Sequence, residues 1–330
     1  MPRGSFSQEI LQNSSKTFHA QDGIFQQNER DRGVCPSPDA ERCDSSAFDA
    51  ELGVIAAANL FRKMRRNGRS RTEIAMKRAL AFAYGVFCYV FFLGVFLRAI
   101  WFVWTMDRQP AQSTLSYALL IDAALLGAFA LQHSGMARQG FKRAWIRFVP
   151  RPLERSTYVV MASLMLFAVA EFWQPLPGVI WTVSDPTAVR GLQVLFWLGW
   201  LLLFTCTLLI DHFDLFGLKQ VWKYLRHEQY EPPRFRTPGP YRLVRHPLYL
   251  GFLIAFWSAP RMTSGHLFFA VMCTGYILVA IQLEERDLVM FHGDAYRSYR
   301  RGVSMLVPLP GKKFESGQRQ EKAVSMERRV

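Results

Sequence analysis

Apolar residues in this chain gather in long blocks, rather than at the alternating or helical spacing of a soluble domain. From Leu80 onward six blocks follow one another, separated by polar and basic stretches. They are residues 80–104, 114–133, 156–174, 191–210, 247–259 and 266–283. A helix rises about 1.5 Å per residue, so the first four blocks can cross about 30 Å of hydrocarbon. The pattern predicts an all-α integral membrane protein with five or six transmembrane helices.

The last two blocks are predicted to form a C-terminal helical hairpin. The fifth block is too short to cross a membrane alone, and the sixth is of marginal length. Pro260 and Gly265 lie between them, and these residue types are typical of a tight turn. In such a hairpin the start of the fifth block and the end of the sixth lie side by side.

The first 75 residues differ in composition from the rest of the chain. They contain none of the nine Trp and none of the eleven Tyr, and only five of the 27 Phe. A segment with so few large apolar side chains cannot bury a core, so we expect residues 1–75 to be a disordered extension. A short helix is conceivable at Ala47–Leu60. We expect the membrane domain to cover residues 76–308 and a disordered tail to cover 309–330.

The charge of the chain is strongly positive, with 40 Lys and Arg against 26 Asp and Glu. Such a balance can indicate nucleic-acid binding, but here the charge falls mainly between the apolar blocks and on the tails, so we expect no nucleic-acid partner. The stretch 134–155 holds six basic residues and one Glu. The positive-inside rule places this stretch in the cytoplasm, and alternation then places residues 211–246 and both termini there too.

Cysteine usage gives no sign of a metal centre or a disulfide framework. The five cysteines include no pair at zinc-site spacing, and no cluster of His and Cys accompanies them. No Gly-rich nucleotide loop follows a strand pattern either. We expect neither a metal ion nor a nicotinamide cofactor.

Ionisable residues gather at the ends of the last three blocks. Asp211, His212 and Asp214 end the fourth, residues 245–251 (RHPLYLG) open the fifth, and residues 284–287 (EERD) close the sixth. Polar groups at this depth must face protein or water. The predicted hairpin would bring RHPLYLG and EERD to one pocket, where paired carboxylates suit a cationic ligand or a ribose diol. The alternative is that these charges only pair with the basic loops.

The C-terminal motifs resemble those of the isoprenylcysteine carboxyl methyltransferase superfamily. The resemblance rests on residues 245–251, on Glu284–Glu285, on residues 291–301 (FHGDAYRSYRR) and on Pro308, in this order. Because three motifs occur in order beside an apolar hairpin, the signal is more specific than the RHPxYxG motif alone.

Upstream segments are similar to one branch of that superfamily. These are residues 76–85 (MKRALAFAYG), 212–222 (HFDLFGLKQVW) and 235–239 (FRTPG), which resemble the nurim-related methanethiol S-methyltransferases. The resemblance covers about residues 76–308. It implies S-adenosylmethionine as cofactor, in a cytoplasmic pocket at the ends of the last helices, and a small volatile thiol as substrate, with dimethyl sulfide as product. The lipid bilayer is the other implied partner.

The resemblance also implies which residues bind the cofactor. Carried over by motif, they are Tyr241, His246, Pro247, Leu248, Tyr249 and Glu284, with the neighbouring Glu285 as a further candidate. The carboxyl-methylating branch tends to carry Arg one turn before the acidic pair, where this chain has Ala280. A substrate carboxylate therefore fits less well than a small uncharged thiol.

Methyl transfer from a sulfonium to a thiol needs alignment, a dry pocket and a base. Charge on the donor and the acceptor is neutralised as the bond forms, so excluding water favours the reaction. A thiol with a pKa of about 8.5 is mostly protonated at neutral pH. The candidate bases are His246 and His212, and either could instead be a structural histidine. Residues 285–308 are expected to close the site as an interfacial helix, or else to be a basic anchor on anionic lipid.

Three kinds of function stay open on the sequence. The first is methylation of a small thiol. The second is methylation of another acceptor, such as an isoprenylated cysteine, a phospholipid amine or a different thiol. The third is a membrane reductase that uses NADPH, or a nurim-like protein without catalytic activity.

Overall fold

The structure is a computed structural model that describes residues 45–108, 110, 113–233 and 235–308. The chain divides into two units, residues 1–67 and 68–330, and every contact given below lies within the second. The expectations of disorder for residues 1–44 and 309–330 fall outside the described residues.

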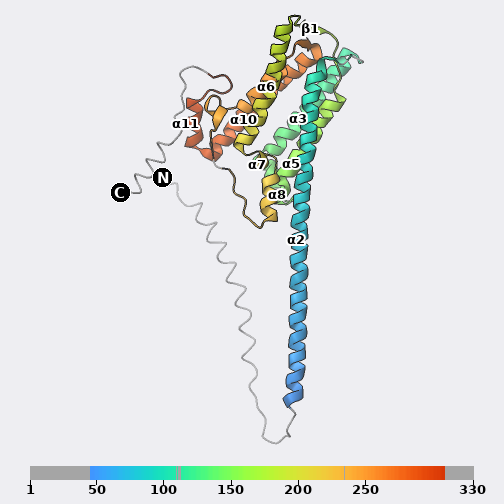
Figure 1. Ribbon diagram of the computed structural model, residues 1–330, viewed down its shortest axis with the longest axis vertical. Helices are drawn as coiled ribbons and strands as arrows, with labels where there is room; N and C mark the ends of the chain where they lie inside the picture. The colour runs from blue at the N-terminus through green and yellow to red at the C-terminus, as the bar shows by residue number, and fades with distance from the viewer. Residues whose placement is uncertain (1–44, 109, 111–112, 234, 309–330) are drawn as a thin grey trace, which may run out of the picture. The chain divides into compact units, whose positions relative to one another are not determined.

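The described chain is almost entirely helical (Figure 1). The α-helices are α2 (Ser45–Thr105), α3 (Leu115–Ala137), α4 (Gln139–Trp145), α5 (Glu154–Phe172), α6 (Pro186–Ile210), α7 (His212–Leu215), α8 (Leu218–Leu225), α9 (Pro247–Trp257), α10 (Ser264–His292) and α11 (Asp294–Gly302). Short 3₁₀ helices are η1 (Met106–Arg108), η2 (Arg151–Leu153) and η3 (Gly239–Arg242). The strands are β1 (Val179–Thr182) and β2 (Arg261–Thr263).

The apolar blocks of the sequence correspond to the long helices. Five helical stretches in the described residues are long and apolar enough to cross a membrane, and the fifth block forms the shorter apolar helix α9. The stretches are residues 71–108, 115–137, 151–172, 186–210 and 264–292. The prediction of an all-α membrane protein is therefore confirmed, and the chain is a multi-pass integral membrane protein.

Two local features differ from the expectation. The short helix expected at Ala47–Leu60 is part of the much longer α2, which begins at Ser45 and continues into the first apolar block. The segment is rich in good helix formers such as Ala, Leu and Arg, which favours this continuation. The strands β1 and β2 were not expected, and they form a small antiparallel pair in which Val179 lies opposite Thr263. The boundary at residue 75 stays a prediction.

Aromatic side chains fill the core between the helices. Phe102, Trp173 and Phe269 meet edge to face, with ring centroids 5.6–5.8 Å apart. Trp200 of α6 makes similar contacts with Phe252 and Phe256 of α9. Such pairs add to the packing of the bundle because the edge of one ring is positive and the face of the other is negative.

The short helix α9 packs most tightly against α6. An added Cβ on Gly251 would lie 2.7 Å from the carbonyl oxygen of Gly199, and an added Cβ on Gly199 would lie 2.7 Å from that of Gly251. The two backbones therefore touch, as small residues permit in membrane bundles. The fifth block is thus held by α6, although its start still meets the end of α10 as the hairpin prediction required.

Replacing Gly251 by alanine is expected to destabilise the bundle by about 1–3 kcal/mol, because the methyl group has no space between the two backbones. Thermal unfolding in detergent would show a lower midpoint. The control is Gly275→Ala on α10, where an added Cβ meets nothing within 4 Å. Equal midpoints for the two variants would contradict the close α6–α9 contact.

Candidate functional site

The chain just before α9 is fixed by the segment that follows α11. The backbone N–H of Arg245 donates to the carbonyl oxygen of Ser304 at 2.8 Å, and that of His246 donates to Met305 at 3.1 Å. Val244 and Ser304 form a parallel bridge. Pro247 then starts α9. The first backbone N–H of a helix has no partner within the helix, so proline loses no hydrogen bond at this position. Two segments nearly 60 residues apart in the chain therefore set the position of the RHPLYLG motif.

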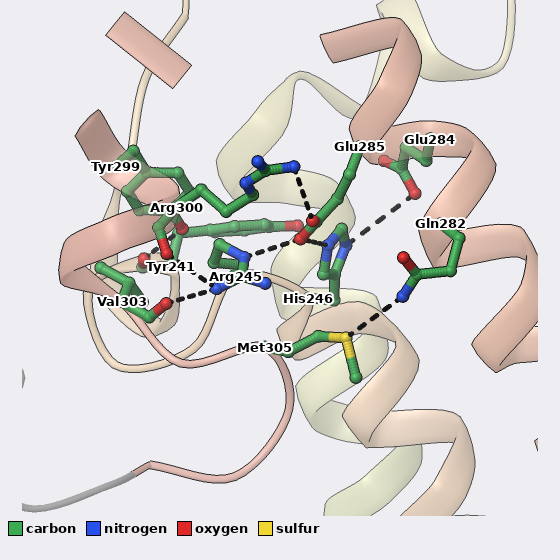
Figure 2. Close-up of polar contacts among 10 residues, drawn as sticks. All are labelled: Tyr241, Arg245, His246, Gln282, Glu284, Glu285, Tyr299, Arg300, Val303 and Met305. Carbon is green, nitrogen blue, oxygen red and sulfur yellow. Dashed lines mark hydrogen bonds and ion pairs between the residues drawn. The ribbon is translucent and has the colours of Figure 1, made fainter. Parts of the chain in front are cut away.

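A buried ion pair joins this segment to α10 (Figure 2). Arg245 Nε donates to Glu285 Oε1 at 2.7 Å, and the two side chains are 10% and 7% exposed. The guanidinium also donates to the carbonyl oxygens of Arg300 and Val303 at the end of α11. Arg300 itself lies 3.9 Å from Glu285. Arg245 thus connects the start of α9, the acidic pair and the end of α11.

His246 lies between the two carboxylates of the acidic pair. Its Nε2 is 3.1 Å from Glu285 Oε1, and its Nδ1 is 3.9 Å from Glu284 Oε2 (Figure 2). The Glu284 side chain is 44% exposed, whereas Glu285 is buried. The structure therefore brings the RHPLYLG and EERD motifs together at one place, and the two glutamates differ sharply in their surroundings.

Two tyrosines from the expected cofactor set lie near Glu284. The side chain of Tyr241, in η3, interacts with Cys206 and Glu284, and burial raises the pKa of Tyr241 well above its usual range. The hydroxyl of Tyr249 interacts with the carboxylate of Glu284. A tyrosine of raised pKa keeps its proton at neutral pH and can donate a hydrogen bond. Tyr241, His246, Tyr249 and Glu284 therefore form one cluster, which we call the Glu284 cluster.

The two other residues of the expected set serve as apolar support. Pro247 is fully buried at the first turn of α9. Leu248 packs against the main aromatic core. Both lie next to His246 in the chain, so they fix the turn that presents its ring.

His212 is held by other partners. Its Nε2 lies 2.8 Å from the Tyr89 hydroxyl, and its Nδ1 lies 2.8 Å from Thr207 Oγ1. Burial lowers the pKa of His212, so the ring is neutral at pH 7. Phe204 and Phe216 pack edge-on against it. Both ring nitrogens are thus occupied by groups of α2 and α6, and a role as base stays a prediction.

Helix α11 packs against the protein beside Tyr241 and Arg245 through its aromatic face. Tyr296 and Tyr299 are buried and pack against Phe235 and the α10 side chains Leu288 and Val289. The Tyr299 hydroxyl donates to the carbonyl oxygen of Tyr241 (Figure 2). The arginines of α11 are exposed. The aromatic face of α11 therefore contacts protein, and the role of this helix in closing the site stays a prediction.

Arg245 belongs to the RHPLYLG stretch that the sequence placed in the pocket, but it was not among the predicted site residues and its pairing with Glu285 was not predicted. An Arg at the start of an apolar block is usually explained by the positive-inside rule. Here its side chain is nearly buried and pairs with Glu285. The signal that could have found it was the pair of adjacent glutamates, because one of two neighbouring acids in a membrane protein needs a cation.

Comparison with known proteins finds relatives that carry the same name and align with more than two thirds of this chain. The methanethiol S-methyltransferase of Mycobacterium tuberculosis is 51% identical over 241 residues, which are 71% of this chain and 98% of that protein. The one from Crocosphaera subtropica is 48% identical over 244 residues, 72% of this chain and 95% of that protein. Nurim of Xenopus laevis is 34% identical over 176 residues, 51% of this chain and 61% of that protein.

No family model matches the chain, and no solved structure matches it. The relatives nevertheless agree with one another, and the alignment spans almost the whole length of the Mycobacterium tuberculosis protein. The chain belongs to the methanethiol S-methyltransferase family, the nurim-like branch of the isoprenylcysteine carboxyl methyltransferase superfamily.

Proposed function

We propose that the chain transfers a methyl group from S-adenosylmethionine to methanethiol and releases dimethyl sulfide. The names of its relatives support methyl transfer over reduction. The observation that carries the proposal is the difference between the two adjacent glutamates. Glu285 is buried and paired with Arg245, whereas Glu284 is 44% exposed and has its carboxylate 3.9 Å from His246.

The residues of the Glu284 cluster suit this cofactor. A carboxylate can accept two hydroxyl hydrogen bonds from a ribose or pair with a positive charge, and Glu284 is placed to do either. Tyr241 and Tyr249 can donate hydrogen bonds beside it. When bound, S-adenosylmethionine supplies a reactive methyl group on a positively charged sulfur.

The other residues of the site hold this arrangement. Arg245 and Glu285 fix the start of α9 against α10, and His246 lies between the two carboxylates, with its Nδ1 3.9 Å from Glu284. The end of α11 contacts this arrangement through Tyr299, whose hydroxyl donates to the carbonyl oxygen of Tyr241. Because both ring nitrogens of His246 face carboxylates, its geometry supports a role on the cofactor side of the site.

Headspace gas chromatography over cells that express the full chain and receive methanethiol is the direct test. We expect dimethyl sulfide above the level from cells that express Glu284→Gln. Equal amounts from the two strains, with both proteins present in the membrane fraction, would contradict the proposal. If the protein binds S-adenosylmethionine but forms no dimethyl sulfide, the assignment to a methyltransferase family stands and the methyl acceptor is a different molecule.

We further propose that the Glu284 end of the bundle and both termini face the cytoplasm. Residues 134–155, at this end, hold six basic residues and one Glu, which supports the orientation. A reporter that fluoresces only in the cytoplasm, fused after Val330, should be bright, and a fused periplasmic phosphatase should be inactive. The opposite pair of results would reverse the assignment.

A further inference from the structure

The buried carboxylate of Glu285 faces two nitrogens with one oxygen (Figure 2). Its Oε1 lies 2.7 Å from Arg245 Nε and 3.1 Å from His246 Nε2. The side chains of all three residues are at most 10% exposed. Because these side chains are shielded from water, Arg245 and Glu285 decide what His246 can carry on its Nε2.

Arg245 makes Glu285 an acceptor only. A guanidinium keeps its charge in proteins, and a buried one is stable only beside a negative charge. Glu285 is therefore an ionised carboxylate, which accepts hydrogen bonds and donates none. The proton of His246 must then lie on Nε2, which donates it to Glu285 Oε1. In a neutral imidazole the other nitrogen, Nδ1, is left as an acceptor.

The Nδ1 edge of the His246 ring faces the second glutamate. Nδ1 lies 3.9 Å from Glu284 Oε2, which is too far for a hydrogen bond, and no described residue donates to Nδ1 at bonding distance. Glu284 is the more exposed of the two glutamates, with 44% of its side chain accessible. Nδ1 and Glu284 thus form a pair of neighbouring acceptors. A ligand group that only donates, such as an ammonium group, suits such a pair.

We propose that Arg245 and Glu285 are positioning residues, which keep the His246 proton on Nε2 so that Nδ1 and Glu284 can accept a donor group of S-adenosylmethionine. This inference rests on the proposed function. With the proton on Nδ1 instead, His246 would point an N–H group at Glu284. These two side chains would then pair with each other, and the cofactor would have to break that pair. Arg245 and Glu285 exclude this arrangement without contacting the cofactor themselves.

The surroundings of His212, the other candidate histidine, set no such preference. Its Nε2 lies 2.8 Å from the Tyr89 hydroxyl, and its Nδ1 lies 2.8 Å from Thr207 Oγ1. A hydroxyl can donate or accept a hydrogen bond, so either nitrogen of His212 can carry the proton. His246 differs because one of its nitrogens meets a carboxylate that an arginine holds in the ionised form.

Solid-state ¹⁵N NMR of the histidine-labelled enzyme in lipid membranes measures the proton positions directly, because protonated and unprotonated ring nitrogens resonate far apart. The chain has seven histidines, so the His246 signals are assigned as those missing from His246→Asn. We expect Nε2 to carry a proton with and without S-adenosylmethionine, and Nδ1 to carry none in the complex. An unprotonated Nε2, or a proton on Nδ1 in the complex, would overturn the proposal.

The double variant Arg245→Met with Glu285→Gln tests whether these two residues set the tautomer. Without the arginine, the amide can turn its N–H toward His246 Nε2, and the ring proton should move to Nδ1 and pair with Glu284. We expect the Nδ1–H form in the ligand-free spectrum. The Kd for S-adenosylmethionine, from isothermal titration, should rise about 10- to 100-fold, which corresponds to one lost hydrogen bond to a charged group.

Glu285→Gln alone is the matched control, because Arg245 still holds the amide oxygen where Nε2 can donate to it. We expect this variant to keep the Nε2–H form and a Kd close to the wild-type value. The same tautomer in the folded single and double variants would show that Arg245 and Glu285 only stabilise the fold, and the proposal would be wrong. If neither variant folds, the wild-type spectra decide. A wild-type enzyme that binds no S-adenosylmethionine would instead overturn the proposed function, and its ligand-free spectrum would still report whether Nε2 is protonated.

Discussion

Replacing Glu284 by glutamine is expected to weaken binding of S-adenosylmethionine by about 10- to 100-fold, because a hydrogen bond to a charged group contributes about 1.5–3 kcal/mol. The substitution keeps the shape of the side chain and removes its charge. The Glu284 side chain is 44% exposed, so its surroundings do not depend on that charge for folding. Isothermal titration of the purified enzyme in detergent would measure the Kd.

The control for Glu284→Gln is Asp294→Asn at the start of α11. This change also removes one negative charge at the same end of the bundle, from a side chain that is 95% exposed and pairs only weakly with Arg297. We expect the control to keep the wild-type Kd. The same Kd for all three proteins would exclude Glu284 from the cofactor site, whereas equal losses in both variants would indicate a general effect of charge.

The long helices could be predicted from the sequence because burial in lipid leaves a local signal. Each of the six apolar blocks lies within or largely within one helix, although α2 begins well before the first block and α10 continues beyond the sixth, and α9 begins at Pro247 as the block does. The bilayer fixes the length of a spanning helix, and the alternation of basic and neutral loops is local as well. Helix length and loop charge can therefore both be read from the sequence without knowing which helices contact one another.

The contacts between helices could not be predicted in the same way. The close approach of Gly199 and Gly251 depends on two residues about 50 positions apart. The pairing of Val244 with Ser304, and that of β1 with β2, join segments that are still further apart. Each arises from the arrangement of the whole bundle.

The candidate site residues could be named from sequence motifs, but their packing could not be predicted. Motif resemblance identified His246, Glu284 and Glu285, and the hairpin placed them together. The resemblance placed Glu284 ahead of Glu285 as a cofactor contact, but it did not predict that Glu285 is buried in an ion pair. Adjacent residues on a helix point in different directions, and the sequence alone does not show which of them meets a neighbouring segment. The two glutamates differ in the structure because Arg245 pairs with the buried Glu285, whereas the Glu284 side chain is 44% exposed. The difference in burial and pairing between the two carboxylates is thus a product of packing.

Replacing Arg245 by methionine is expected to destabilise the protein more than any other single substitution at this site, by about 3–5 kcal/mol, because the buried charge of Glu285 loses its nearest cation. Among the described residues, Glu285 then keeps only His246, at 3.1 Å, and the half-exposed Arg300, at 3.9 Å. The substitution also removes the hydrogen bonds to the carbonyl oxygens of Arg300 and Val303, which hold the end of α11. Chemical unfolding in detergent, followed by tryptophan fluorescence, would measure the change.

Comparison with Arg300→Met tests whether the loss of stability in Arg245→Met comes from the burial of the Arg245–Glu285 ion pair. Arg300 lies 3.9 Å from the same carboxylate but is 49% exposed, so its removal should cost less than about 1 kcal/mol. Adding Glu285→Gln to Arg245→Met should restore part of the stability, since the uncompensated charge is then gone. If Arg245→Met and Arg300→Met are equally stable, Arg245 does not hold α9, α10 and α11 together, and the fixed position of Glu284 needs another explanation.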